Sequence, residues 1–222
     1  MSPTLPQLPR TLPDSKLTEA IESACHAIAN GGVAVFPTDT FYALGANALD
    51  AAAVAKIFEL KGRNEHQPLP VLIPDAESIH DLCDEVPPVA FELAERFWPG
   101  ALTIVLPKSK SVPKSVTGGG ETVGVRVPDH VVALQILCRV GCPVTGTSAN
   151  PSGTPPTKDP GKIRSWFEGS EITFVDAPCG SLTVPSTVLN LTTSPASVVR
   201  AGGVGIDDLR ELLPDVTIGP PR

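Results

Sequence analysis

The 222-residue sequence has few aromatic residues and no long hydrophobic run. No apolar stretch approaches the roughly 18 residues that a membrane-spanning helix requires, so we expect no contact with a membrane. The opening segment, "MSPTLPQLPRTLPDSK", also lacks the hydrophobic centre of a secretory signal, and a cytoplasmic location is the resulting expectation. Its composition predicts a Pro-rich, flexible lead-in over residues 1–14.

Several common catalytic and metal-binding patterns are missing. The five cysteines are scattered without a CxxC pair and the four histidines do not cluster, so we expect no protein-held metal. No GxxxxGK[ST] loop, no GxGxxG after a strand and no GxSxG turn is present. These absences exclude the familiar phosphate loops and the hydrolase nucleophile elbow.

An excess of positive charge is missing as well. The net charge of −7 and the isoelectric point near 5.1 argue against a general nucleic-acid binder, which would carry a basic surplus. Any anionic ligand must therefore be met by a local group of cationic side chains.

The hydrophobic pattern alternates between helical and strand periods along the chain. It predicts helices near residues 17–30, 51–62, 76–83, 88–97, 130–140, 159–167 and 206–213. It predicts strands near residues 33–36, 69–73, 101–108, 122–128, 143–149, 171–177, 186–191 and 197–202. We therefore expect one α/β domain over residues 15–213, with a twisted, mixed, open β-sheet flanked by helices, and a tail over residues 214–222.

Polar segments at the strand ends are the candidates for chemistry, because ligands gather there in open α/β sheets. Lys61 and Arg63 in "KGRNEHQPL" either complement the end of a helix or reach a ligand. "PTDT" (residues 37–40) is either a turn or a hydroxyl-lined pocket, with Thr40 and Tyr42 as donors.

"TGTSANPSG" (residues 145–153) is either a turn or a phosphate cradle using Ser148 and Asn150. Arg126, in an alternating strand, either faces solvent or reaches a carboxylate. Ser186 and Arg200 belong to similar strand segments.

The order of these blocks resembles that of the threonylcarbamoyl-AMP synthase family (YrdC/Sua5 type). The resemblance runs from about Leu17 to Leu213 and includes "GGVAVFPTDTFYALGANA", "FWPGALTIVL", "GVRVPDH", "PVTGTSANPSG", "STVLNL" and "VVRAGGV". A KxR…SxN signature matches at Lys61, Arg63, Ser148 and Asn150. The chain is similar to the short, single-domain form of the family.

This resemblance implies a concave cavity in which L-threonine, bicarbonate and ATP give threonylcarbamoyl-AMP and pyrophosphate. Mg²⁺ would accompany ATP, and a separate complex would transfer the product to tRNA, with weak tRNA contact by this chain an open question. The implied threonine contacts are Thr40, Tyr42, Arg126 and Ser186. The implied ATP contacts are Lys61, Arg63, Gln67, Thr147, Ser148, Asn150 and Arg200, with Lys61 and Arg63 also catalytic.

Three positions depart from the family pattern. Ala43 stands where the family usually has Gly, Gln67 replaces a more frequent Asn, and Leu72 replaces a His found in many members. These changes leave strictness for threonine open. Two alternatives remain: a carbamoyl-adenylate-forming domain of the hydrogenase-maturation type, and a double-stranded RNA, tRNA or ribosome-assembly binding module.

Overall fold

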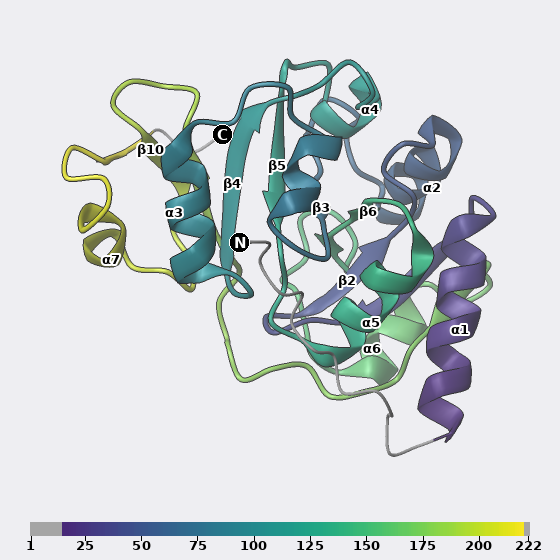
Figure 1. Cartoon of the computed structure of the whole chain (residues 1–222). Coiled ribbons are helices and arrows are strands. Elements are labelled where there is room, and N and C mark those ends of the chain that lie inside the picture. Colours follow the sequence, from purple (N-terminus) through teal and green to yellow (C-terminus); the bar gives the residue numbers. More distant parts are fainter. Residues whose placement is uncertain (1–14, 220–222) are drawn as a thin grey trace.

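The computed structural model describes residues 15–219 and is shown in Figure 1. Its helices are α1 Ser15–Ala29, α2 Ala51–Lys61, the 3₁₀ helix η1 Glu77–Asp81, α3 Pro88–Phe97, α4 Lys114–Thr117, α5 Val131–Val140, α6 Pro160–Trp166 and α7 Ile206–Arg210. Its strands are β1 Val33–Pro37, β2 Tyr42–Gly45, β3 Val71–Leu72, β4 Leu102–Pro107, β5 Thr122–Arg126, β6 Val144–Thr145, β7 Thr147–Ser148, β8 Ile172–Phe174, β9 Thr187–Asn190, β10 Ser197–Arg200 and β11 Thr217–Ile218. Within the described range, no helix is both long and apolar enough to cross a bilayer.

The α/β class is confirmed, but the strands form two sheets where one was expected. One sheet has the order β7-β2-β1-β8, and the other has the order β11-β10-β9-β4-β5-β3-β6. Both contain parallel and antiparallel pairs, for example β1 with β8 and β1 with β2. The sheets are therefore mixed and open.

The division occurs inside the strand predicted over residues 143–149. Gly146 separates β6, which pairs with β3, from β7, which pairs with β2. A Cβ at position 146 would overlap the buried side chain of Leu72, so glycine lets the chain pass close to β3 while it changes sheets. The amide of Thr145 still donates to the carbonyl of Ala46, which ties the two sheets together.

Local capping chemistry explains where α2 begins and ends. The carboxylate of Asp50 accepts hydrogen bonds from the amides of Ala52 and Ala53, as an N-cap does. Gly62 ends the helix in the left-handed conformation, with φ of 56°. Asp159 caps α6 in the same way as Asp50 caps α2. The lead-in predicted over residues 1–14 lies outside the described residues.

Some elements differ from the expectation. β2 lies within residues 37–50, for which the sequence predicted neither helix nor strand, because its four residues are too few to show clear alternation. α4 lies between the strands predicted over residues 101–108 and 122–128, where no helix was expected, and β11 extends along β10 within the expected tail. The helix predicted over residues 76–83 is the shorter 3₁₀ helix η1.

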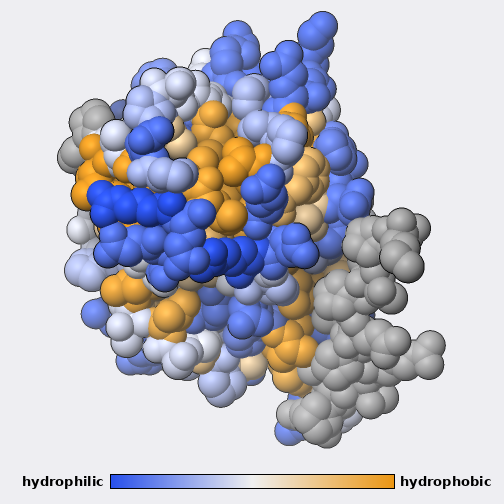
Figure 2. Space-filling model, turned by 60° about the vertical axis from the view of Figure 1, so that its left-hand side comes forward, coloured by the Kyte–Doolittle hydropathy of each residue, from blue (hydrophilic) through white to orange (hydrophobic). Residues whose placement is uncertain are grey.

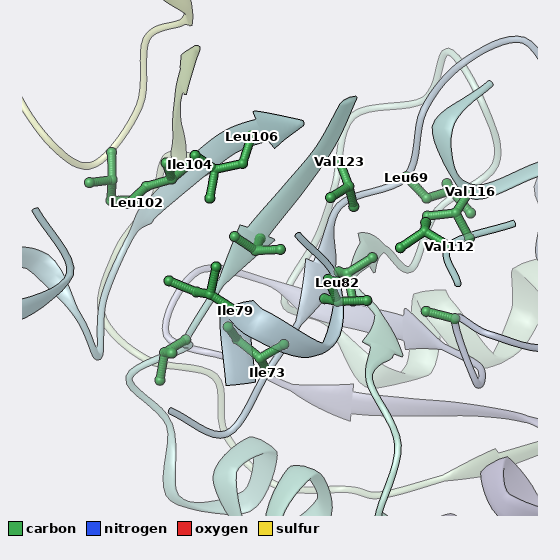
Figure 3. Close-up of a cluster of buried hydrophobic side chains, with 14 of the residues drawn as sticks. Leu69, Ile73, Ile79, Leu82, Leu102, Ile104, Leu106, Val112, Val116 and Val123 are labelled. Carbon is green, nitrogen blue, oxygen red and sulfur yellow. The ribbon is translucent and has the colours of Figure 1, made fainter. Parts of the chain in front are cut away.

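Alternation along the central strands separates a core face from an open face. Leu102, Ile104 and Leu106 of β4 point into the main hydrophobic core. In Figure 3 these three side chains lie in one cluster with Val123 of β5 and Ile79 of η1. The residues between them must face the other side, because successive side chains of a strand alternate. That other side forms the floor of the cavity described below.

Helices cover the remaining faces. α1 packs beside α5 and against β1, with Ile21, Ile28, Ile136 and Leu137 in a second hydrophobic cluster (Figure 1). α3 is seen between β4 and β10 in Figure 1, and its Ala90, Leu93 and Ala94 belong to the main hydrophobic core. Figure 2 brings forward the side of α7 and β10, where hydrophobic surface is grouped between bands of hydrophilic residues.

Candidate functional site

A cavity of about 230 Å³ opens between the two sheets. Most of the predicted site residues line it, and they come from segments far apart in the sequence: Thr40, Tyr42, Arg63, Arg126, Thr147, Ser148, Ser186 and Arg200. Lining residues that the sequence did not single out include Thr38, Phe41, Pro68, Pro70, Thr103, Gly124, Gly146, Pro156, Pro185 and Val188. Ala43 and Leu72 also line the cavity, so both departures from the family pattern lie at its wall.

Strand alternation places the lining residues of the larger sheet. Thr103, Gly124 and Arg126 stand on the face of β4 and β5 opposite the core. A Cβ at position 124 would come within 3.1 Å of the Thr103 methyl, so glycine keeps the floor open between these strands. The alternation of polar Thr103 with Leu102 and Ile104 is the sequence signal that could have identified it.

Arg200 reaches the cavity through an irregularity in β10. Val198 pairs with Leu189 in the core, but the register shifts before the next pair, and Arg200 pairs with Val188 at the cavity. With regular pairing, Val198 and Arg200 would share one face of the strand. The β-bulge therefore directs the guanidinium toward the cavity.

The Arg200 guanidinium is held against the segment that precedes β9. Its Nε and Nη2 donate to the carbonyl of Ser186, and Nη2 also donates to the Ser186 hydroxyl at 3.0 Å. That hydroxyl lies 2.8 Å from the hydroxyl of Thr103. Arg200 and Ser186, predicted for separate ligands, thus form one polar group on the cavity wall.

Arg63 and Arg200 give the cavity positive charge without a carboxylate partner among the described residues. Nη2 of Arg63 donates to the carbonyl of Pro68, while its Nε is buried without any partner in that part of the chain. Burial lowers the pKa of both groups, and the charges of Arg126 and Arg63 lower the pKa of Arg200 further. Such closely spaced cations favour an anionic ligand.

Thr40 presents an acceptor to the cavity, although the sequence suggested a donor. The hydroxyl of Thr38 donates to the carbonyl of Phe41 at 2.7 Å, which uses its only hydrogen. The hydroxyl of Thr40, 3.1 Å away, must therefore donate to Thr38 and keeps its lone pairs for a ligand.

Tyr42 lines the cavity, while its hydroxyl is already committed. The hydroxyl donates to the carbonyl of Ala177 at 2.7 Å. Burial raises its pKa to about 12, with smaller contributions from Cys179 and Asp176. The donor role that the sequence suggested for Tyr42 thus has its hydrogen engaged with the backbone.

Arg126 reaches a carboxylate, one of the two outcomes considered from the sequence. Its Nη2 lies 2.6 Å from both carboxylate oxygens of Asp39, and its Nε donates to the carbonyl of Gly100. Burial lowers the pKa of Arg126, whereas the charge and hydrogen bonds of Asp39 raise it. Asp39 was not predicted as a site residue, and its long-range pairing left no signal in the sequence.

Lys61 lies outside the cavity lining, beneath the loop that carries Ser148. Lys61 is 3% exposed. Its Nζ donates to the carbonyls of Ser148 and Asn150 at 2.5 Å each. Burial and the charge of Arg63 lower its pKa to about 7, while the two carbonyl acceptors favour the protonated form. The structure therefore gives Lys61 a bracing position.

Gln67 and Asn150 are also absent from the cavity lining. Gln67 is exposed, and the amide nitrogen of Asn150 donates to the carbonyls of Pro151 and Thr154. The Oδ1 atom of Asn150 is buried without a partner among the described residues. The proposed ATP contacts of both residues stay predictions.

The long segment between β8 and β9 ends at Pro185 and Ser186, which line the cavity. His130 Nδ1 accepts from the amide of Val132, so its Nε2 carries the hydrogen and donates to the carbonyl of Pro178 at 2.9 Å. The amide of Gly180 donates to the carbonyl of Thr38, and Lys158 donates to the carbonyl of Gly180. The hydrogen bond that Nδ1 accepts from Val132 requires a neutral His130.

We expect part of the acid sensitivity of the fold to come from His130. Burial lowers its pKa, opposed by the Pro178 carbonyl and by Asp39 and Asp129. As the pH falls below about 6.5, the unfolded chain therefore takes up a proton before the folded chain does, and stability declines. Urea unfolding between about pH 7.5 and 5.5 should show a smaller loss in His130→Asn, which keeps a capping acceptor but does not titrate.

The exposed His66 provides the matched control for this measurement. His66→Asn should retain the pH dependence of the parent chain. An unchanged dependence in His130→Asn would show that this imidazole does not couple folding to pH.

Comparison with known proteins places these features in a family. The family model described as "Telomere recombination" (Sua5/YciO/YrdC) matches residues 26–202. The threonylcarbamoyl-AMP synthase of Pyrococcus abyssi is 40% identical over 200 residues, which cover 90% of this chain and 59% of that protein. The putative threonylcarbamoyl-AMP synthase of Mycobacterium leprae is 36% identical over 201 residues, covering 90% of each chain.

A solved structure shares the fold at similar identity. The crystal structure of P. abyssi Sua5 complexed with L-threonine superposes with a TM-score of 0.87 at 41% identity, covering 90% of this chain and 59% of that one. The chain thus spans less than two thirds of the Pyrococcus protein. A full-length HypF structure at 21% identity, with a TM-score of 0.71, shows likeness of fold alone. The extent of the family match and the identity to these relatives establish that this chain belongs to the Sua5/YciO/YrdC family.

Proposed function

We propose that the chain is an L-threonylcarbamoyladenylate synthase, a nucleotidyltransferase that forms threonylcarbamoyl-AMP and pyrophosphate from L-threonine, bicarbonate and ATP. The observation that carries this proposal is the convergence of Arg63, Arg200 and hydroxyl side chains on one cavity. The synthase names of the relatives and the threonine complex of the Pyrococcus protein support it. The product would serve tRNA modification through a separate transfer complex.

The chemistry requires alignment and charge stabilisation rather than a protein nucleophile. The ammonium group of threonine and bicarbonate give a carbamate, with loss of water and a proton. An oxygen of the carbamate then attacks the α-phosphorus of ATP, and pyrophosphate leaves with the electron pair of the broken P–O bond. Positioned cations stabilise the charge that develops on the leaving group.

The cavity offers suitable groups for both halves of this reaction. Arg63 and Arg200 suit the phosphates, as do the hydroxyls of Thr147 and Ser148, which form no hydrogen bond within residues 15–219. The acceptor of Thr40 suits a donor of the amino acid. Holding reactants in line is worth up to roughly 7–11 kcal/mol in favourable intramolecular cases.

Mg²⁺ would enter with ATP in this proposal. The cavity lining contains hydroxyl oxygens but no carboxylate, and residues 15–219 hold no cluster of potential metal ligands. This donor set fits an ion carried mainly by phosphate oxygens. Bound Mg²⁺ would neutralise phosphate charge, while the chain's own residues orient the reactants.

The test is the dependence of pyrophosphate release on each substrate. We expect release only when threonine, bicarbonate and ATP are present together, with serine as a competitor because Ala43 and Leu72 lie at the cavity wall. Release that ignores threonine would contradict the proposal. Activity with carbamoyl phosphate would favour the hydrogenase-maturation reaction, and tight salt-sensitive tRNA binding would favour the RNA-binding alternative.

A further inference from the structure

The three cavity-lining arginines differ in their charge partners. Arg126 forms a buried ion pair with Asp39, in which each residue is 6% exposed. Arg63 and Arg200 form no ion pair within residues 15–219. The cavity therefore has one neutralised guanidinium and two that keep their full positive charge.

Asp39 also determines which donors of Arg126 remain. A guanidinium carries five N–H groups on three nitrogens. Nε donates to Gly100 and Nη2 to both oxygens of Asp39, which leaves Nη1 as the nitrogen without a partner in the described chain. A ligand carboxylate can thus reach Nη1, but a two-nitrogen fork would require it to displace Asp39.

Asp39 acts from behind the cavity wall. Its neighbours Thr38 and Thr40 line the cavity, whereas Asp39 does not. A Cβ at position 180 would overlap the backbone of Asp39, so Gly180 lets the segment before β9 close tightly over it. The amide of Gly180 donates to the carbonyl of Thr38, which holds that cover in place.

We propose that Asp39 is a specificity-determining positioning residue that reserves Arg126 for a monocarboxylate and leaves phosphate to Arg63 and Arg200. The negative charge of Asp39 cancels the positive charge of Arg126. A polyanion therefore gains little beside Arg126 and is repelled by the nearby carboxylate. A carboxylate with one negative charge still receives the two N–H groups of Nη1. This inference rests on the proposed function for the identity of the two ligands.

The experiment compares Asp39→Asn with the parent chain in the pyrophosphate-release assay. Freed from Asp39, Arg126 should lose its fixed orientation and gain net charge. We expect the KM for threonine to rise about 10–100-fold, the cost of a small misplacement, while the KM for ATP stays near that of the parent. Added pyrophosphate should compete with threonine in the variant but not in the parent chain.

Two further variants keep the test decisive. Asp39→Glu retains the charge and therefore the fold, but its longer arm shifts the guanidinium, so the KM for threonine should rise without competition by pyrophosphate. Asp207→Asn removes an exposed partner of Arg210 on α7 and should match the parent. The inference would be overturned if Asp39→Asn left the KM for threonine and the inhibition by pyrophosphate unchanged. If Asp39→Asn does not fold, an unchanged KM for threonine in Asp39→Glu would overturn it.

A parent chain without threonine-dependent release would instead refute the proposed function. The binding of inorganic phosphate then tests the electrostatic inference. Thermal shifts with inorganic phosphate should be larger in Asp39→Asn than in the parent chain, and equal shifts would overturn it.

Discussion

Arg63→Ala is expected to reduce threonine-dependent pyrophosphate release by about 10²–10³-fold, the loss typical of one charge-stabilising group. The side chain lines the cavity and forms no ion pair among the described residues, so its positive charge is available to a ligand. In the proposed reaction it would stabilise charge on the departing pyrophosphate. Initial rates at saturating substrate, with folding checked by circular dichroism, measure this effect.

Arg210→Ala is the matched control for Arg63→Ala. Arg210 is half-exposed on α7, where it pairs with Asp207. Its removal should change neither rate nor fold. Equal activity of Arg63→Ala and the parent chain would contradict a role in binding the ligand. Arg63 would then only complement the dipole at the end of α2.

Lys61→Met should reduce both stability and activity, although Lys61 does not line the cavity. The change leaves the carbonyls of Ser148 and Asn150 without their buried donor. The Ser148 carbonyl still accepts from the amide of Asn150, so the Asn150 carbonyl is the acceptor that loses its donor. We therefore expect a loss of about 1–3 kcal/mol in the free energy of unfolding. Movement of the Ser148 loop should lower turnover about 100-fold.

Lys56→Met tests whether loss of any α2 lysine has this effect. Lys56 is exposed, and its Nζ donates to the carbonyl of Gly31 at the surface. Urea unfolding and pyrophosphate release of this variant should remain close to the parent values. A Lys61→Met protein as stable and active as Lys56→Met would contradict the bracing role.

Local chemistry made much of the fold predictable. The cap at Asp50, the helix over Pro88–Phe97 and the alternating strand at Leu102–Pro107 depend on neighbouring residues, whose preferences are visible in the sequence. The division at Gly146 was missed because it depends on the pairing of β7 with β2, which is distant in the sequence. β2 was missed because a strand of four residues carries too little alternation to be recognised by itself.

The sequence by itself determined the α/β class, the family and most of the side chains that meet at the cavity. Only the tertiary structure decided how those side chains are used. The β-bulge before Arg200 directs its side chain to the cavity face of β10. Asp39 accepts hydrogen bonds from Nη2 of Arg126, and Lys61 donates to the carbonyl of Ser148. Each outcome depends on hydrogen bonds between residues far apart in the chain, and local propensity carries no information about such pairings.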